Sequence, residues 1–129
     1  QFKEEQDHAK ILFNYIIRRD GRVELEGLDA VPKEWKSIHE VFESTLKHEQ
    51  EITAKINNLV SLAKTNNDYA TESLLQWFID EQVEEEDNAR DIIDKLDMIK
   101  DNGFGIYMLD KELAVRTYTQ AAPLANSVL

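Results

Sequence analysis

The chain has 129 residues and a formal net charge of −11, with 4 Gly, 2 Pro and no Cys. This length suits one domain with a hydrophobic core, and the low Gly and Pro content favours an all-α fold. The negative charge disfavours nucleic acid as a partner, since proteins that bind it carry basic patches, and it suits a protein that handles cations. The absence of Cys excludes disulfides and thiolate metal sites. No apolar run reaches membrane-spanning length and no signal peptide is visible, so we expect a cytoplasmic protein without a membrane partner.

A helix is expected over residues 1–19, followed by a long extended segment. Two arginines lie in the last turn of this helix, and Gly21 is its expected terminator. Residues 21–35 have no helical period and contain both Gly and Pro, which indicates an extended crossover along the surface. The chain begins with Gln1 and shows helical patterning with no capping residue ahead of it. We therefore expect the true start of this region to lie upstream.

Two long helices and one short helix follow the crossover. Ser37 is the expected N-cap of the first, with Glu40 at the capping-box offset. Thr71 opens the second after the turn sequence TNNDY, and the sequence DNGFG ends it. The expected ranges are about 38–64, 71–100 and 106–116, and the tail 117–129 has no clear pattern.

The lengths of the connections indicate how these helices are arranged. The short turn makes the two long helices after the crossover antiparallel neighbours. The long crossover lets the first helix lie parallel to the second. Three long helices and an uncapped start predict a four-helix bundle with a long crossover and a short C-terminal helix, whose opening helix is missing from this chain. Residues 1–116 would form the helical domain, and 117–129 a C-terminal tail.

Polar side chains interrupt the apolar stripe of each long helix. The stripe of the second long helix runs through Ile38, Phe42, Thr45, Glu49, Ile52, Ile56, Leu59 and Ala63. That of the third runs through Leu75, Phe78, Gln82, Glu85, Ala89, Ile92 and Leu96. In the first helix a single face carries Glu5, His8, Leu12, Tyr15 and Arg19. A buried carboxylate is costly unless its charge is compensated, and the sequence places no Lys or Arg at this level. The missing counter-charge is most simply a metal ion.

Each of these motifs has a simpler explanation when it is taken alone. A Glu-x-x-His pair on a helix is usually an exposed surface pair, and the acidic sequence EQVEEE at residues 81–86 is more often a solvated face. A glutamate on an apolar stripe can also reach solvent after a small rotation of its helix. Inward-facing polar residues in the stripes of three successive helices are much harder to produce by chance, so the combination favours a metal site.

The ligand types narrow the choice of metal. Carboxylate oxygens with one imidazole and no thiolate suit iron(II), manganese or zinc, whereas calcium and magnesium rarely take histidine. Glu-x-x-His with single Glu residues from other helices is the dinuclear carboxylate pattern of helical bundles. The usual pattern has two Glu-x-x-His pairs, but this chain has one, and its third long helix carries Gln82-x-x-Glu85 instead.

With these residues the sequence resembles the bacterial non-haem ferritins over about residues 1–116. The segments that carry the resemblance, in the family's order, are EEQDHAKILFNYI, KHEQEITAKINNL, LLQWFIDEQVEEE and GIYMLDKEL. The resemblance implies a ferritin-like four-helix bundle with a di-iron centre. Glu5 would bridge two irons, His8 would bind the first, and Glu49 and Glu85 would bind the second. Gln82 would lie near them, either as a weak ligand or as a neighbour that contacts the ligands. The family's third iron site would be formed by Glu4, Glu81 and Glu84.

Three features of the sequence bear on how far the resemblance extends. Related haem-binding ferritins carry a Met directly after the first-helix Glu of the Glu-x-x-His motif, where this chain has Gln6, so no haem is expected. The glutamate of the family's opening helix is absent from this chain, which leaves the first iron with fewer ligands. The sequence after about Arg116 is not typical of the family.

The function implied by the resemblance is iron oxidation and storage. Fe(II) would be oxidised by dioxygen or hydrogen peroxide, and ferric mineral would form inside a hollow shell of many subunits. In such a shell the crossover sequence GRVELEGLDAV would lie along a subunit contact. The alternatives are a non-catalytic shell subunit with an incomplete centre, a different dimetal oxidase that acts on an organic substrate, and an acidic helical interaction module without metal.

Overall fold

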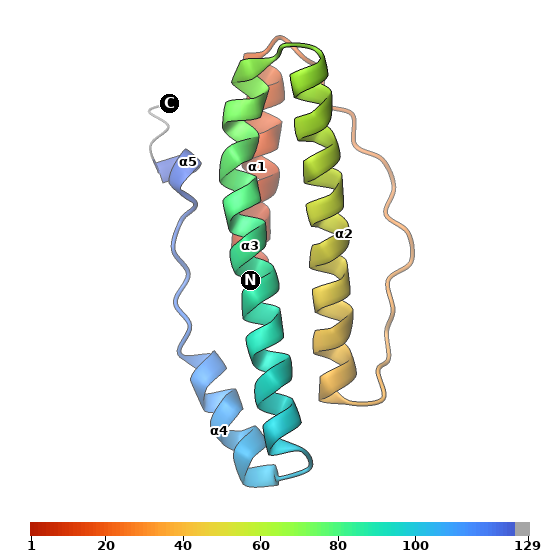
Figure 1. The fold of residues 1–129 in the computed structure, drawn as a ribbon, viewed down its shortest axis with the longest axis vertical. Helices are drawn as coiled ribbons and strands as arrows, with labels where there is room; N and C mark the ends of the chain where they lie inside the picture. The colour runs from red at the N-terminus through yellow and green to blue at the C-terminus, as the bar shows by residue number, and fades with distance from the viewer. Residues whose placement is uncertain (126–129) are drawn as a thin grey trace. The chain divides into compact units, whose positions relative to one another are not determined.

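The computed structural model describes residues 1–125, and these residues form α-helices and connecting segments without any strand. The helices are α1 (Phe2–Arg18), α2 (Ile38–Thr65), α3 (Tyr69–Ile99), α4 (Gly103–Ala114) and α5 (Ala122–Ala125), as drawn in Figure 1. The predicted all-α class is therefore confirmed. The last four residues of the predicted tail 117–129 lie outside the described part of the chain.

The chain forms two compact units. The central unit spans residues 32–109, and the terminal unit joins residues 1–31 to the chain from 110 onward. The predicted division into a domain at 1–116 and a tail at 117–129 stays a prediction.

The central unit is built on a hairpin of two long helices. α2 and α3 are joined by the turn Asn66–Asp68 and run antiparallel, side by side, as predicted from the short connection (Figure 1). Ser37 caps α2 as expected, because its hydroxyl accepts a hydrogen bond from the backbone N–H of Glu40 at 3.1 Å. The Glu40 carboxylate accepts the backbone N–H of Lys36 rather than that of the capping residue itself.

The start of α3 differs from the prediction by two residues. Asp68, and not Thr71, is the N-cap: its carboxylate accepts the backbone N–H of Thr71 at 3.2 Å and the hydroxyl of Thr71 at 2.7 Å. An aspartate at this position satisfies an unpaired N–H and also places negative charge at the positive end of the helix dipole. The left-handed residue in the turn is Asn67, with φ of 54°.

The buried side chains of the hairpin follow the predicted stripes. In α3 the predicted apolar positions are all buried, namely Leu75, Phe78, Ala89, Ile92 and Leu96. In α2 burial is concentrated at Glu49, Ile56 and Ala63. Two members of the α2 stripe, Ile38 and Leu59, are half exposed, at 50% and 45%. The 3.6-residue period therefore predicted the face of each helix correctly, and the buried part of α2 is shorter than its stripe.

The end of α1 and the start of α4 differ from the sequence prediction, and a glycine lies at each. α1 ends at Arg18, and the residue in the left-handed conformation is Asp20, with φ of 55°, rather than Gly21. Gly21 is required there for a different reason, since a Cβ at this position would lie 2.8 Å from Cγ2 of Ile16. The helix predicted over 106–116 begins earlier, at Gly103, because the side chain of Asn102 accepts the N–H groups of the first turn at 3.0 and 3.1 Å.

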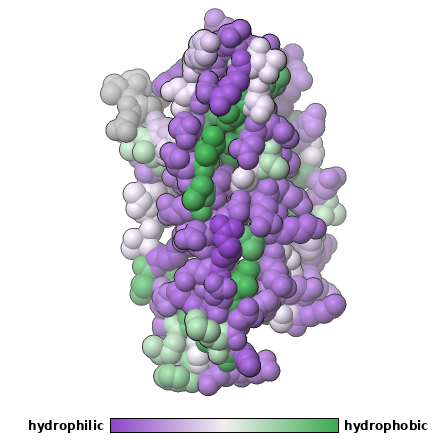
Figure 2. All heavy atoms as spheres, in the orientation of Figure 1, coloured by the Kyte–Doolittle hydropathy of each residue, from purple (hydrophilic) through white to green (hydrophobic). Residues whose placement is uncertain are grey.

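The surface reflects the acidic composition. Figure 2 shows a largely hydrophilic face with hydrophobic residues visible between the polar ones. None of the helices within residues 1–125 is both long enough and apolar enough to cross a membrane.

The cap of α3 provides a test of the hairpin. Asp68→Ala should lower the free energy of unfolding by about 1 kcal/mol, because it leaves a backbone N–H of the first turn without its acceptor. Ser73→Ala, at an exposed position inside the same helix, is the matched control and should leave stability nearly unchanged. Urea denaturation followed by circular dichroism measures both. Equal stability of the two variants would contradict the capping role of Asp68.

Candidate metal centre

Glu49 and Gln82 meet in the interior of the central unit. Glu49 comes from the middle of α2 and is 7% exposed, and Gln82 comes from α3 and is 4% exposed. The side-chain amide of Gln82 donates to the backbone carbonyl of Glu49 at 3.1 Å and lies 3.4 Å from Oε2 of its carboxylate. Glu49 and Gln82, which interrupt the predicted apolar stripes, are therefore both buried and in contact across the hairpin.

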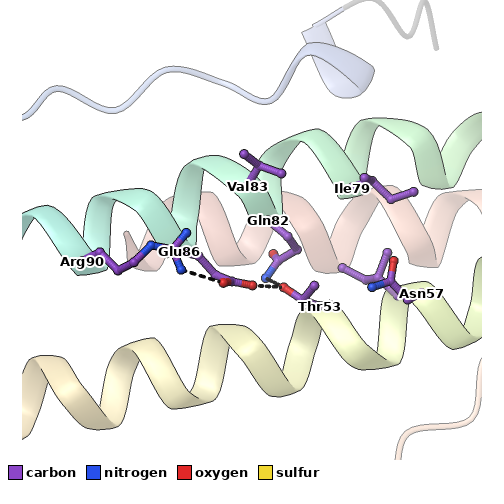
Figure 3. Close-up of a pocket in the computed structure, with 8 residues that line it drawn as sticks. Thr53, Asn57, Ile79, Gln82, Val83, Glu86 and Arg90 are labelled. Atoms are coloured by element: carbon purple, nitrogen blue, oxygen red, sulfur yellow. Dashed lines mark hydrogen bonds and ion pairs between the residues drawn. The ribbon is translucent and has the colours of Figure 1, made fainter.

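A chain of hydrogen bonds extends from this pair toward the surface of α3 (Figure 3). The Gln82 amide lies 3.4 Å from the hydroxyl oxygen of Thr53, and the Thr53 hydroxyl donates to Oε1 of Glu86 at 2.7 Å. Nη1 of Arg90 contacts Oε2 of Glu86 at 3.0 Å. The bond from Thr53 holds the pKa of Glu86 below its usual value, with help from Arg90, although partial burial opposes the shift. Glu86 therefore remains an ionised acceptor at the end of this series of hydrogen bonds.

Thr53 and Glu86 were not singled out by the sequence stripes. Each lies four residues, one helical turn, after a predicted stripe residue: Thr53 after Glu49 and Glu86 after Gln82. Because α2 and α3 are antiparallel, these two offsets run in opposite directions along the hairpin and do not by themselves predict a pair. Only the observed packing of α2 against α3 brings the two side chains within hydrogen-bonding distance.

A small cavity of about 240 Å³ adjoins these residues. Polar groups and apolar side chains of both helices line it, and the lining comprises Thr53, Ile56, Asn57, Ile79, Gln82, Val83, Glu86 and Arg90 (Figure 3). Val83 is 66% exposed, so the cavity opens to the surface of the central unit. The buried amide of Gln82 therefore borders open space on one side.

The acidic residues of α3 that are predicted to bind iron differ in how exposed they are. Glu81 and Glu85 are half-buried, and Glu84 is exposed. These residues and Gln82 all lie within two turns of one helix. Their assignment to iron sites stays a prediction.

In the terminal unit the predicted ligands of α1 lie next to each other but differ in exposure. Oε2 of Glu5 is 3.4 Å from Nδ1 of His8, and the two side chains are 51% and 14% exposed. Glu4 is more enclosed than Glu5, at 26%. The buried residues of this helix are Asp7 and Ile11. The inward face of α1 therefore includes Asp7 and Ile11 beside the largely enclosed His8, whereas Glu5 and Leu12 of the predicted face are exposed.

Asp7 is held by the chain beyond α4. Oδ2 of Asp7 accepts the hydroxyl of Tyr118 at 2.5 Å and the backbone N–H of Ala121 at 3.3 Å, and Nζ of Lys10 lies 3.5 Å from Oδ1. The bond from Tyr118 is the main reason that the pKa of Asp7 lies below its usual value, and the same bond raises the pKa of Tyr118. Residues after Arg116, which have no family-like pattern, are thus attached to α1 through one buried carboxylate.

No group of three or more His, Asp or Glu side chains within residues 1–125 is arranged to hold a metal ion. The predicted ligands are divided between the terminal unit, which carries Glu5 and His8, and the central unit, which carries Glu49, Gln82 and Glu85. The di-iron centre and the third iron site therefore stay predictions.

Comparison with known sequences gives consistent matches. A family model described as a ferritin-like domain matches residues 1–99. The chain is 44% identical over 108 residues to a bacterial non-heme ferritin of Campylobacter jejuni, covering 84% of this chain and 65% of that protein. It is 42% identical over 120 residues to a bacterial non-heme ferritin of Staphylococcus haemolyticus, covering 93% of this chain and 72% of that protein. The chain thus spans about two thirds of the length of these relatives.

Comparison with solved structures agrees. An open-pore ferritin from the archaeon Archaeoglobus fulgidus matches with a TM-score of 0.89 at 41% identity, over 91% of this chain and 72% of that one. A structure described as a humanized archaeal ferritin matches with a TM-score of 0.90 at 39% identity, over 92% of this chain and 72% of that one. The ferritin-like fold class predicted from the sequence is confirmed by these matches.

The contact between Asp7 and Tyr118 predicts a pH-dependent attachment. Because the folded pKa of Asp7 is lowered, the bond stabilises the fold above the pKa of an unfolded Asp, about 3.9, and this stabilisation is lost as the pH falls through the lower folded value. Tyr118→Phe should raise the pKa of Asp7 toward its usual value, as measured by NMR of the carboxyl carbon. Tyr69→Phe, whose hydroxyl contacts Asn67 instead, is the control. An unchanged Asp7 titration in Tyr118→Phe would contradict the contact.

Proposed function

This chain belongs to the ferritin family, and from that premise we propose that it binds Fe(II), oxidises it to Fe(III) and stores it as ferric mineral inside a multi-subunit shell. The observation that carries the proposal is Glu49, a carboxylate buried at mid-helix in α2 with the Gln82 amide against it. A carboxylate at a buried position is costly to maintain for packing alone. Its position matches the level at which the sequence resembles the iron-binding residues of the bacterial non-haem ferritins.

In this proposal iron is the substrate, and the side chains act as its ligands. Glu5 bridges two ions, His8 binds the first, and Glu49 and Glu85 bind the second. Gln82 is a weak ligand through its carbonyl oxygen, because an amide nitrogen carries no lone pair suited to a cation. Glu4, Glu81 and Glu84 bind a third ion nearby.

Oxidation at such a centre balances with either oxidant. Two Fe(II) ions give up two electrons, which together with two protons reduce dioxygen to hydrogen peroxide or hydrogen peroxide to two molecules of water. Carboxylate oxygens are hard ligands and favour the ferric product. The surrounding excess of acidic residues, which gives the chain its charge of −11, attracts the next cations.

The crossover between α1 and α2 supports assembly into a shell. Its apolar side chains are strongly exposed: Leu25 is 87%, Leu28 96% and Val31 71% exposed. Exposed apolar side chains along one segment are typical of a protein–protein contact. We place a contact between copies of this chain here, in a cytoplasmic shell.

A second candidate is a ferritin-like subunit that assembles but does not oxidise iron. It is favoured by the half-exposed side chain of Glu5, the residue proposed to bridge the two ions. The two candidates differ in one measurable property, the initial rate of Fe(II) oxidation in air.

Glu49→Ala tests the centre. Fe(II) oxidation, followed by the ultraviolet absorbance of ferric species, should be fast in the wild type. In the variant the oxidation rate should fall by on the order of 10–100-fold or more, which is the loss typical when residues around a metal site are removed. Glu51→Ala, an exposed glutamate on the same helix, is the control and should keep the wild-type rate. A wild-type rate no faster than that of buffer would refute oxidation and leave the non-catalytic subunit.

Leu28→Asp tests the shell. The wild type should sediment as a particle many times heavier than one chain. The variant should sediment as a much smaller species with unchanged helicity, because a charge at a contact of apolar side chains must lose its hydration. Asn58→Asp adds the same charge on the exposed face of α2 and should leave assembly intact. A wild type that sediments as a monomer would contradict storage in a shell.

A further inference from the structure

We propose that Thr53 and Glu86 are positioning residues that set the orientation of the Gln82 amide, so that its nitrogen faces Glu49 and its carbonyl oxygen is presented for metal. This inference rests on the proposed iron function, and neither residue is itself a ligand. A side-chain amide has two nearly isosteric orientations, and only one of them offers an oxygen to a cation.

The hydrogen-bonding capacities of the neighbouring groups decide the orientation. Glu86 carries a carboxylate, which can only accept, so the single hydroxyl proton of Thr53 must point toward it along the 2.7 Å contact. The oxygen of Thr53 then presents only lone pairs to Gln82, 3.4 Å away. The group of Gln82 that faces Thr53 must consequently be the donor, its NH₂.

The contacts with Glu49 favour the same orientation. The backbone carbonyl of Glu49 at 3.1 Å and its carboxylate at 3.4 Å are both acceptors. Three acceptors therefore surround the nitrogen of Gln82, and the carbonyl oxygen lies on the other side of the amide group. Rotating the amide by half a turn would bring oxygen against oxygen at every one of these contacts.

The packing around Gln82 does not select this orientation unaided. The cavity of about 240 Å³ borders Thr53, Gln82 and Glu86, so the amide has room to turn on that side (Figure 3). Two of the three contacts to its nitrogen, at 3.4 Å, are long for hydrogen bonds. Without the carboxylate of Glu86, the Thr53 hydroxyl could rotate and donate to the amide oxygen, and the orientation would no longer be unique.

Glu86 is itself held in place by Arg90. The two residues are four apart on α3, and their 3.0 Å contact occupies Oε2, which leaves Oε1 turned toward Thr53. A relay thus runs from the exposed Arg90 through Glu86 and Thr53 to the buried Gln82 and Glu49. Residues that orient metal ligands in this way contribute strongly to affinity, and their loss typically costs about 10–100-fold.

Thr53→Val tests the inference, since it removes the hydroxyl and keeps the shape of the side chain. Anaerobic titration with Co(II) alone, followed by calorimetry and by the visible absorption of the bound ion, measures binding without oxidation. We expect the affinity to fall roughly tenfold or more and the absorption to change, because the set of ligand orientations changes. Thr53→Ser, which restores the hydroxyl, should recover the wild-type affinity and spectrum.

Thr45→Val is the matched control for the loss of a hydroxyl. Thr45 is half-buried on the same helix, but its hydroxyl donates to the backbone carbonyl of Val41 and lies outside the relay. The Thr45→Val variant should leave Co(II) binding unchanged. This result would separate a positioning role of Thr53 from a general effect on α2. If Thr53→Val does not fold, Glu86→Gln serves instead: an amide there can donate to Thr53 or accept from it, so the Gln82 orientation is lost and Co(II) affinity should again fall.

The outcomes distinguish this inference from the proposed function. Wild-type Co(II) affinity in Thr53→Val, or in Glu86→Gln where that variant is used, would overturn the positioning role. Fast Fe(II) oxidation by the wild type would in that case still support the ferritin function. If Thr53→Val lowers the Co(II) affinity and Thr53→Ser does not restore it, the positioning role is likewise overturned. A wild type that neither binds Co(II) nor oxidises Fe(II) would overturn both.

Discussion

The contact between Gln82 and Glu49 is the constraint on which the central unit depends. Both side chains are nearly inaccessible to solvent, so each must find its hydrogen-bond partners within the protein. The amide of one reaches the carbonyl and the carboxylate of the other only when α2 and α3 are aligned at this level. Apolar side chains on either side would tolerate a shift of one turn, whereas this polar pair would not. The pair thus sets the register of the hairpin and, in the proposed centre, the position of a ligand.

A similar solution occurs in the terminal unit. Asp7 is 2% exposed, and its shortest hydrogen bond comes from a neutral hydroxyl, that of Tyr118. In each unit a buried carboxylate therefore accepts hydrogen bonds from uncharged groups, and a basic residue, Lys10 or Arg90, lies at the edge of the network. The hydrogen bonds from Tyr118 and Thr53 lower the pKa of Asp7 and of Glu86, so these two carboxylates keep the negative charge that attracts cations.

Membership of the ferritin family connects these details to the proposed function. The proposed relay gives a reason for Gln82, which stands where the general dinuclear pattern has the glutamate of its second Glu-x-x-His pair. A glutamine can bind weakly through its oxygen, but it requires neighbours that prevent its nitrogen from taking that place. Thr53 and Glu86 have the hydrogen-bonding capacities that this requires. A weak ligand held in a single orientation suits a centre whose product must leave.

The amino-acid sequence by itself determined the helical class, the antiparallel hairpin and the buried face of α3, because a 3.6-residue period and a short turn follow from local chemistry. It also placed Glu49 and Gln82 in the interior. Tertiary structure decided what local patterns cannot encode: that Asp68 rather than Thr71 caps α3, and that the buried row of α1 runs through Asp7. The buried Asp7 accepts a hydrogen bond from Tyr118, which lies 111 residues away along the chain. Likewise, Thr53 and Glu86 form a pair only because α2 and α3 pack at one particular register, and periodicity specifies a face but not the atoms that meet across it.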